Sequence, residues 1–256
     1  MALAPPARAQ RSSRRAYILN GYSTDTRAQC AFSVHNETLN IWTHIIGTVL
    51  FALQLQRVLH ARNTVLAGYA FAAIVMFACS AFSHATSAHK PAQHARALAA
   101  DFFGIGLFVA MSQAAGVHYA FGCDTDARAA YLMGIAVLFG ISAGVSVRRN
   151  KARRWRWYAL SVALGGVPLL HHVLALRSGE HESMRAVQHA FARAVGYYAL
   201  GFVFFVTRVP ERFAPGVFDI VAHSHQFWHL LVLCGALEYL HALRLGAAHA
   251  AGRVCA

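Results

Sequence analysis

Apolar residues recur in seven long runs along the chain, separated by short polar stretches. A helix needs roughly 20 mostly apolar residues to cross the hydrocarbon core of a bilayer. Helices are expected because lipid offers no hydrogen-bond partner to the edge of an open sheet. The predicted membrane helices are residues 41–58, 64–83, 102–121, 129–147, 157–176, 189–207 and 224–243. The chain is therefore expected to be an all-α, seven-transmembrane helical bundle.

The stretches between these runs are too short to separate domains. One membrane domain is predicted over residues 17–245, followed by a short C-terminal tail over 246–256. Residues 1–16 are rich in Pro, Arg and Ser and have little to bury, so they are expected to be a disordered basic tail. They are not followed by an apolar core of signal-peptide length, and no cleaved signal is expected.

The composition supports a membrane protein. Hydrophobic residues make up 57% of the chain, mean hydropathy is +0.41 and only 13% of residues are charged, whereas about a quarter is usual in a soluble domain. The net charge of +13 is distributed between the apolar runs and does not form one basic domain. We interpret these charges as topology signals, which argues against nucleic acid and for membrane lipids as partners.

The division of Lys and Arg between the two sides predicts the orientation. With the N-terminus inside, the inner segments carry 15 of these residues and the outer segments carry 8. Cytoplasmic segments of membrane proteins are enriched in Lys and Arg. The acidic stretch CDTD at 123–126 falls on the outer side. We expect a cytoplasmic N-terminus and an outside C-terminus.

The five cysteines are isolated, and no two form a C-x-x-C pair. This pattern predicts neither a disulfide framework nor a thiolate zinc site. The cysteines are Cys30, Cys79, Cys123, Cys234 and Cys255.

Ionisable and polar side chains stand at the ends of three of the apolar runs, where they are costly and usually functional. Ser80 and His84 end the second run, Asp101 begins the third, and His225 and His229 begin the seventh. In any up-and-down bundle of seven helices these three helix ends lie on the same side. His84, Asp101, His225 and His229 are therefore expected at one depth, with Ser80 one helical turn from His84.

Three imidazoles at one depth predict a metal site. His225 and His229 are four residues apart and share one face of a helix. Three histidines with an open fourth position match a zinc site that binds water, although histidine also suits copper, iron and nickel. Asp101 would orient or deprotonate the water, or bind the metal directly. In the alternative interpretation, the histidines only hydrogen-bond between helices.

Two further groups of polar residues lie close to these helix ends. Asn36 and Glu37, near Asn40 and His44, are expected either to cap the first helix or to contact the metal region, with a structural role favoured. Glu211 and Asp219 are expected to order the loop before the seventh helix.

Several motifs in order resemble the progestin and adipoQ receptor family. They are ILNGYSTD, SVHNETLNIWTHIIG, Ser80-x-x-x-His84, Asp101-x-x-Gly104-Ile105 and VPERFAPGVFDIVAHSHQFWH. The family includes the adiponectin receptors and the membrane progestin receptors, with hemolysin III proteins and alkaline ceramidases as distant relatives. The resemblance runs from about Asn20 to His241, nearly the whole chain.

This resemblance implies a seven-helix bundle with a cytoplasmic N-terminus in the plasma membrane. It also implies zinc ligands at His84, His225 and His229, with Asp101 holding the zinc-bound water and Ser80 as the motif serine. The N-terminal region is short and the segment between the second and third helices is rich in alanine. The resemblance therefore identifies no protein hormone or G protein as partner.

Three functions are compatible with these residues. The first is a receptor for a lipid, steroid or protein ligand. The second is a zinc-dependent hydrolase of a lipid amide such as ceramide, with Asp101 as general base and Ser80 supporting the oxyanion. The third is a structural zinc site without hydrolase activity. A receptor that signals through lipid amide hydrolysis combines the first two.

Overall fold

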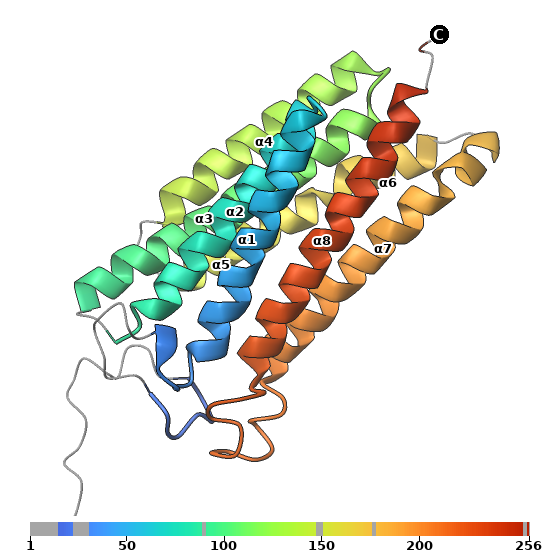
Figure 1. The fold of residues 1–256 in the computed structure, drawn as a ribbon. Helices are drawn as coiled ribbons and strands as arrows, with labels where there is room; N and C mark the ends of the chain where they lie inside the picture. Colours follow the sequence, from blue (N-terminus) through green and yellow to red (C-terminus); the bar gives the residue numbers. More distant parts are fainter. Residues whose placement is uncertain are drawn as a thin grey trace, which may run out of the picture.

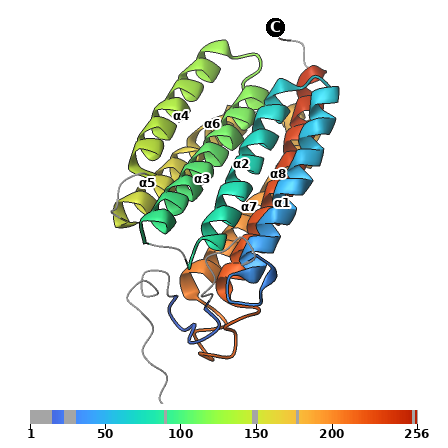
Figure 2. The ribbon, with the colours of Figure 1, turned by 60° about the vertical axis from the view of Figure 1, so that its left-hand side comes forward.

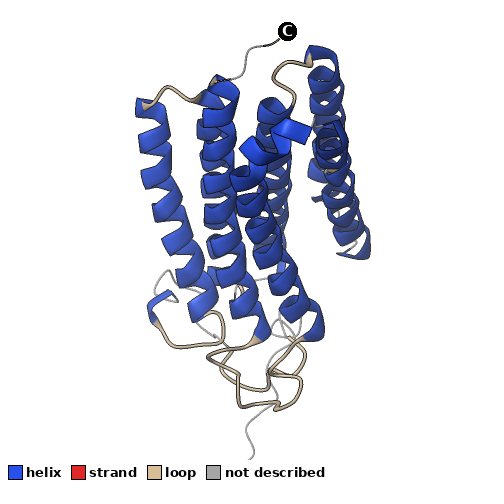
Figure 3. Ribbon diagram, turned by 90° about the vertical axis from the view of Figure 1, so that its right-hand side faces the viewer, coloured by secondary structure: helices blue, strands red, loops and turns tan. Residues whose placement is uncertain are grey.

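A computed structural model of the protein describes residues 15–22, 31–88, 91–146, 151–175, 178–252 and 255, apart from the side chains of residues 91, 151–155 and 178–183. Figure 3 shows that the described residues form helices joined by loops. The helices are α1 (Thr38–His60), α2 (Thr64–Ala85), α3 (Pro91–Ala120), α4 (Thr125–Ser146), α5 (Lys151–Leu164), α6 (Gly166–Ala175), α7 (Ser178–Thr207) and α8 (Ser224–Ala251).

The seven predicted membrane helices are confirmed as seven apolar spans long enough to cross a bilayer. The fifth span, Arg156–Ala175, includes most of α5 and all of α6. This span is interrupted between α5 and α6 because of Pro168. Proline has no N–H to donate to the carbonyl of Leu164, and its ring crowds that carbonyl. Helix α5 ends at Leu164 for this reason.

Three helix ends differ most from the sequence prediction. Helix α7 begins at Ser178, well before the predicted start at residue 189. Helix α3 begins at Pro91, within the stretch expected to be a loop, because proline is well suited to the first turn of a helix. Helix α8 continues to Ala251, within the segment expected to be a C-terminal tail. The basic tail predicted over residues 1–16 lies outside the described residues except for Arg15 and Ala16.

Helices α1, α2, α3 and α8 enclose the main hydrophobic core. Figures 1 and 2 show α1 and α8 side by side, α2 and α3 beside them, and α4 on the far side of α3. Large side chains fill the centre of this four-helix group. They include Phe51, Tyr69, Phe77, Phe108 and Leu240, all at most 5% exposed. Helix α7 packs against α8, while α5 and α6 pack against α3.

Gly104 brings α3 close to α2. A Cβ atom at residue 104 would lie 2.9 Å from the Cα of Met76, so a larger side chain would push the backbones apart. Small residues allow this kind of close approach between membrane helices. Asp101 lies one turn before Gly104, and Ser80 one turn after Met76. Because the two helices are antiparallel, the close contact brings Asp101 beside Ser80.

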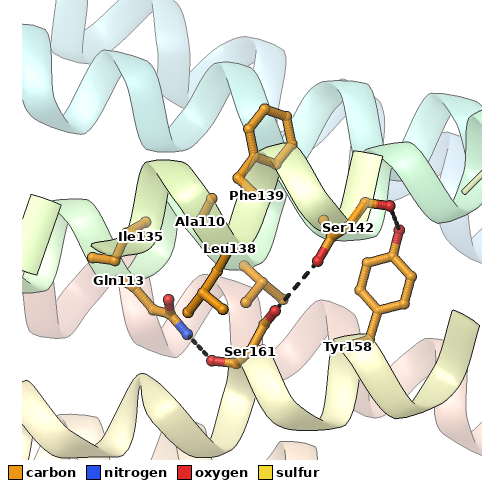
Figure 4. Close-up of a pocket in the computed structure, with 10 residues that line it drawn as sticks. Ala110, Gln113, Ile135, Leu138, Phe139, Ser142, Tyr158 and Ser161 are labelled. Atoms are coloured by element: carbon orange, nitrogen blue, oxygen red, sulfur yellow. Dashed lines mark hydrogen bonds between the residues drawn. The ribbon is translucent and has the colours of Figure 1, made fainter. Parts of the chain in front are cut away.

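Hydrogen bonds between side chains and carbonyls join α3, α4 and α5 (Figure 4). Gln113 Nε2 donates to the carbonyl of Ser161 at 2.8 Å, and the Ser161 and Ser142 hydroxyls are 3.3 Å apart. The Tyr158 hydroxyl donates to the carbonyl of Phe102 at 2.6 Å and lies 2.5 Å from the Ser146 hydroxyl. In lipid, such bonds hold helices together where the hydrophobic effect cannot.

Replacing Tyr158 with phenylalanine is expected to destabilise the bundle by about 0.6 kcal/mol and by no more than about 1.7 kcal/mol, the average and the maximum measured for interhelical hydrogen bonds in a membrane protein. The ring would stay packed while the hydroxyl contacts with Phe102 and Ser146 are lost. Unfolding in a series of mixed micelles of increasing SDS content measures the change. Tyr197→Phe is the control because Tyr197 is exposed on α7. Equal stability of Tyr158→Phe and wild type would contradict the prediction.

A disulfide joins Cys123 to Cys255 across 132 residues of sequence. The cysteine spacing, which predicted no disulfide framework, did not indicate this single bond. Local spacing does not reveal this pairing, because it depends on the α3–α4 turn and the end of α8 lying at the same end of the bundle. Cys79 and Cys234 are free thiols, and Cys30 lies outside the described residues. We call this end of the bundle the disulfide end.

Candidate metal centre

The connection between α7 and α8 positions the first turn of α8. The Glu211 carboxylate accepts hydrogen bonds from the backbone N–H of Ser224, at 2.8 Å, and from its hydroxyl. The Asp219 carboxylate accepts from the backbone N–H groups of Leu19 and Asn20 at 3.0 and 2.7 Å. The expectation that Glu211 and Asp219 order this loop is confirmed. The loop thereby fixes where His225 and His229 lie.

His84 of α2 meets His225 and His229 of α8. One ring nitrogen from each of the three residues lies within 4.8 Å of the others, a grouping that can hold a metal ion. The ring centroid of His84 is 5.2 Å from that of His225 and 4.7 Å from that of His229. The three predicted residues therefore lie at one depth and in one place. We call this end of the bundle the histidine end.

Hydrogen bonds to the start of α1 and to its N-cap residue fix the tautomer of two of these histidines. His84 Nδ1 lies 2.8 Å from a carboxylate oxygen of Glu37, and His229 Nδ1 lies 3.2 Å from the carbonyl oxygen of Asn40. Both partners are acceptors, so each Nδ1 carries the proton. Nε2 of each ring is therefore unprotonated, and its lone pair is available to a metal. This arrangement is common in metal-binding histidines.

Glu37 is the carboxylate at the centre of this arrangement. Burial raises the pKa of Glu37, but the charge of Arg15 and the hydrogen bond from His84 outweigh burial and keep this pKa well below its usual range. The side chain makes no cap hydrogen bond to α1, although Glu37 occupies the cap position. The Glu37 side chain therefore contacts the candidate ligand His84 and does not cap α1, so the capping role that the sequence favoured is wrong for Glu37.

Asp101 and Ser80 lie in the same buried region. Asp101 is 9% exposed and Ser80 5% exposed. The hydroxyls of Ser80 and Ser83 interact with the Asp101 carboxylate. Asp101 Oδ1 has no hydrogen-bond partner among the described residues. A buried acceptor needs a partner, and a water or polar ligand beside the histidines would supply one. The donor set and this oxygen both fit a hydrated metal ion.

Two further histidines at this end have contacts that the spacing did not predict. The ring of His44, 5% exposed, stacks on His229 with centroids 3.7 Å apart and an angle of 15° between planes. His223 is fully buried and its Nε2 donates to the carbonyl of Asn36 at 2.9 Å. Burial lowers the pKa of His223, which favours the neutral ring. Both contacts join residues far apart in the sequence, so no local pattern indicates them.

Residues 32–240 match the family described as haemolysin-III related. That span is most of the chain and contains His84, Asp101, His225 and His229. The chain belongs to the haemolysin-III related family. The resemblance recognised in its motifs is thereby confirmed at the level of the family.

Curated relatives of this haemolysin-III related protein are seven-helix membrane proteins and receptors by name. Heptahelical transmembrane protein 1 of Arabidopsis thaliana is 32% identical over 254 residues, covering 90% of this chain and 76% of the relative. Heptahelical transmembrane protein 3 of the same plant is 30% identical, covering 82% and 75%. Progestin and adipoQ receptor family member 3 of Mus musculus is 30% identical, covering 85% and 76%. An integral, multi-pass membrane protein is thus established.

Proposed function

We propose that this haemolysin-III related protein is a zinc-binding membrane receptor whose signal is produced by hydrolysis of a lipid amide, such as ceramide, at the three-histidine centre. The observation that carries the proposal is the meeting of His84, His225 and His229 beside Asp101. The names of its relatives support the receptor part. The chemistry of the donor set supports the hydrolase part.

The residues at the histidine end suit hydrolysis of an amide. His84, His225 and His229 would hold zinc, which when bound would act as a Lewis acid and make water a nucleophile at neutral pH. Asp101, with an oxygen free of other hydrogen bonds, accepts a proton from the attacking water and delivers it to the leaving amine. The water oxygen adds to the carbonyl carbon, the C–N bond breaks, and a fatty acid and a free amine result. Ser80 supports the oxygen that becomes negative.

The position of the centre favours a lipid as substrate. His84 and His229 belong to spans long enough to cross a bilayer and are buried among helices. A polar head at the histidine end would place its acyl chain along the apolar spans. We propose the plasma membrane as the location, and a lipid or steroid as the ligand that the receptor senses.

A second function is supported by the hydrogen bonds around the histidines. Glu37, the N-cap residue of α1, and Asn40 of α1 contact histidines of α2 and α8, so a metal at this position would fasten three helices together. In that case the zinc is structural and no hydrolysis follows.

Metal analysis of the purified protein tests the proposal. We expect about one zinc per chain, as three histidine ligands imply. Incubation with ceramide should release fatty acid, a chelator should stop the release, and added zinc should restore it. Zinc without any hydrolysis would leave the structural function, and protein without zinc would refute both.

The receptor part has its own test. Thermal-shift measurements across a panel of lipids, sterols and candidate proteins should identify at least one compound that raises the Tm of the wild-type protein. Absence of a shift across the whole panel would remove receptor activity from the proposal.

A further inference from the structure

Segment Arg15–Tyr22 folds back onto the histidine end. Ile18 is 5% exposed, and the backbone N–H of Asn36 donates to the carbonyl of Gly21 at 2.7 Å. Gly21 has a φ of 72°, a conformation that glycine adopts without strain. With the bonds from this segment to Asp219 described above, the segment is attached to both α1 and the α7–α8 connection. It is therefore an ordered part of the bundle.

Arg15 reaches from this segment to Glu37. Arg15 Nε and Nη2 lie 3.2 Å from the two carboxylate oxygens of Glu37, one nitrogen facing each oxygen. The Glu37 side chain is 4% exposed and that of Arg15 is 22% exposed. A buried carboxylate needs a partner of opposite charge, and a parallel pair of bonds from arginine adds fixed geometry. Arg15 thus holds the position of the Glu37 carboxylate.

The same carboxylate reaches the candidate metal ligand. Glu37 Oε2 accepts from His84 Nδ1 at 2.8 Å and from the Asn40 amide at 2.6 Å. Three residues from different parts of the chain are therefore linked as Arg15, Glu37 and His84. Carboxylates that bond a metal-binding histidine fix its ring and raise its basicity, and losing one typically weakens metal affinity by about 10–100-fold.

We propose that Arg15 and Glu37 are positioning residues of the metal centre, and that segment Arg15–Tyr22 thereby sets how tightly the centre holds its metal. This inference rests on the proposed function only in requiring that His84 bind a metal. When Arg15 is absent, the Glu37 carboxylate loses its ionic partner and its paired hydrogen bonds, and the Asn36 and Asn40 amides alone hold it against His84. The His84 ring then samples orientations that do not bind metal. Displacement of the segment would act in the same way.

Zinc affinity in Arg15→Met and Glu37→Gln tests the inference. The full-length protein in detergent is titrated with a chromogenic zinc chelator, and the Kd and the rate of zinc release are measured. We expect Glu37→Gln to weaken binding by about 10–100-fold, and Arg15→Met to weaken it in the same direction. Arg15→Lys should recover part of the loss, because lysine restores the charge without the paired geometry. Histidine ¹⁵N NMR should show His84 losing its fixed Nδ1–H form in both main variants.

Arg193→Met is the matched control. This variant removes the ion pair between Arg193 of α7 and Glu238 of α8, in which Arg193 Nη2 lies 2.5 Å from Glu238 Oε1. The Arg193 side chain is 55% exposed. Its Kd and release rate should equal those of wild type.

The results separate this inference from the proposed function. Wild-type protein that binds no zinc refutes the proposed centre itself. Wild-type protein that binds zinc, with the same Kd and release rate in Glu37→Gln, overturns the inference alone. Glu37→Gln preserves the shape of the side chain, so it decides the matter even where Arg15→Met does not fold.

Discussion

Replacing Asp101 with asparagine is expected to reduce ceramide hydrolysis by about 10²–10⁴-fold, the usual contribution of a general base. Asparagine has nearly the same shape, so the packing of α3 against α2 at Gly104 should persist. The amide cannot take a proton from water. Zinc content should stay at the wild-type value, since the three histidines are unchanged. Fatty acid release and zinc analysis on the same preparation measure both quantities.

Asp126→Asn is the matched control for this experiment. Asp126 lies in the first turn of α4, at the disulfide end and exposed, so hydrolysis should be unaffected. If Asp101→Asn hydrolyses ceramide at the wild-type rate with zinc bound, Asp101 is not the base. Loss of folding together with activity would instead assign Asp101 to the α2–α3 contact.

Replacing His225 with alanine should lower zinc content to less than about a tenth of the wild-type value, because an open zinc site depends on all three of its protein ligands. His225 is the informative choice because it is the most exposed of the three histidines. His84 and His229 also hydrogen-bond to Glu37 and Asn40, whereas the described residues show no such bond for the His225 ring. Its removal therefore tests metal binding with the least disturbance of packing. Zinc analysis after gel filtration measures the effect.

His60→Ala provides the comparison for His225→Ala. His60 lies at the end of α1 near the disulfide end, exposed, with its Nδ1 against the carbonyl of Gln56, and its loss should change neither zinc content nor hydrolysis. Metal-dependent release of fatty acid that survives His225→Ala would refute the mechanism. A large fall in Tm without any hydrolysis in wild type would support a structural metal.

The sequence was sufficient to predict the placement of the candidate ligands. Counting seven apolar runs places residues 84, 101, 225 and 229 on one side, and the structure brings the three histidines together. This prediction succeeds because hydrophobic run length is set by bilayer thickness, a constraint that acts on each helix separately.

The sequence was not sufficient for contacts that depend on how helices rotate and loops fold back. Glu37 and His84 are 47 residues apart, and their bond depends on the rotation of α1 against α2. Arg15 lies in a stretch whose composition resembles a disordered tail, yet it is attached through Glu37. The Cys123–Cys255 bond likewise depends on two chain segments meeting after folding.

That disulfide encloses helices α4 to α8 in one covalent ring, since both ends of the intervening chain are joined. A protease that cuts once in the connection 208–223 would leave two fragments that migrate together on a gel until a reductant is added. Disulfides persist in oxidising compartments. If protein isolated from cells contains the Cys123–Cys255 bond, the C-terminus therefore lies on the exoplasmic face. The candidate metal centre lies at the opposite end, so the proposed hydrolysis would then take its substrate from the cytosolic leaflet and release its products there.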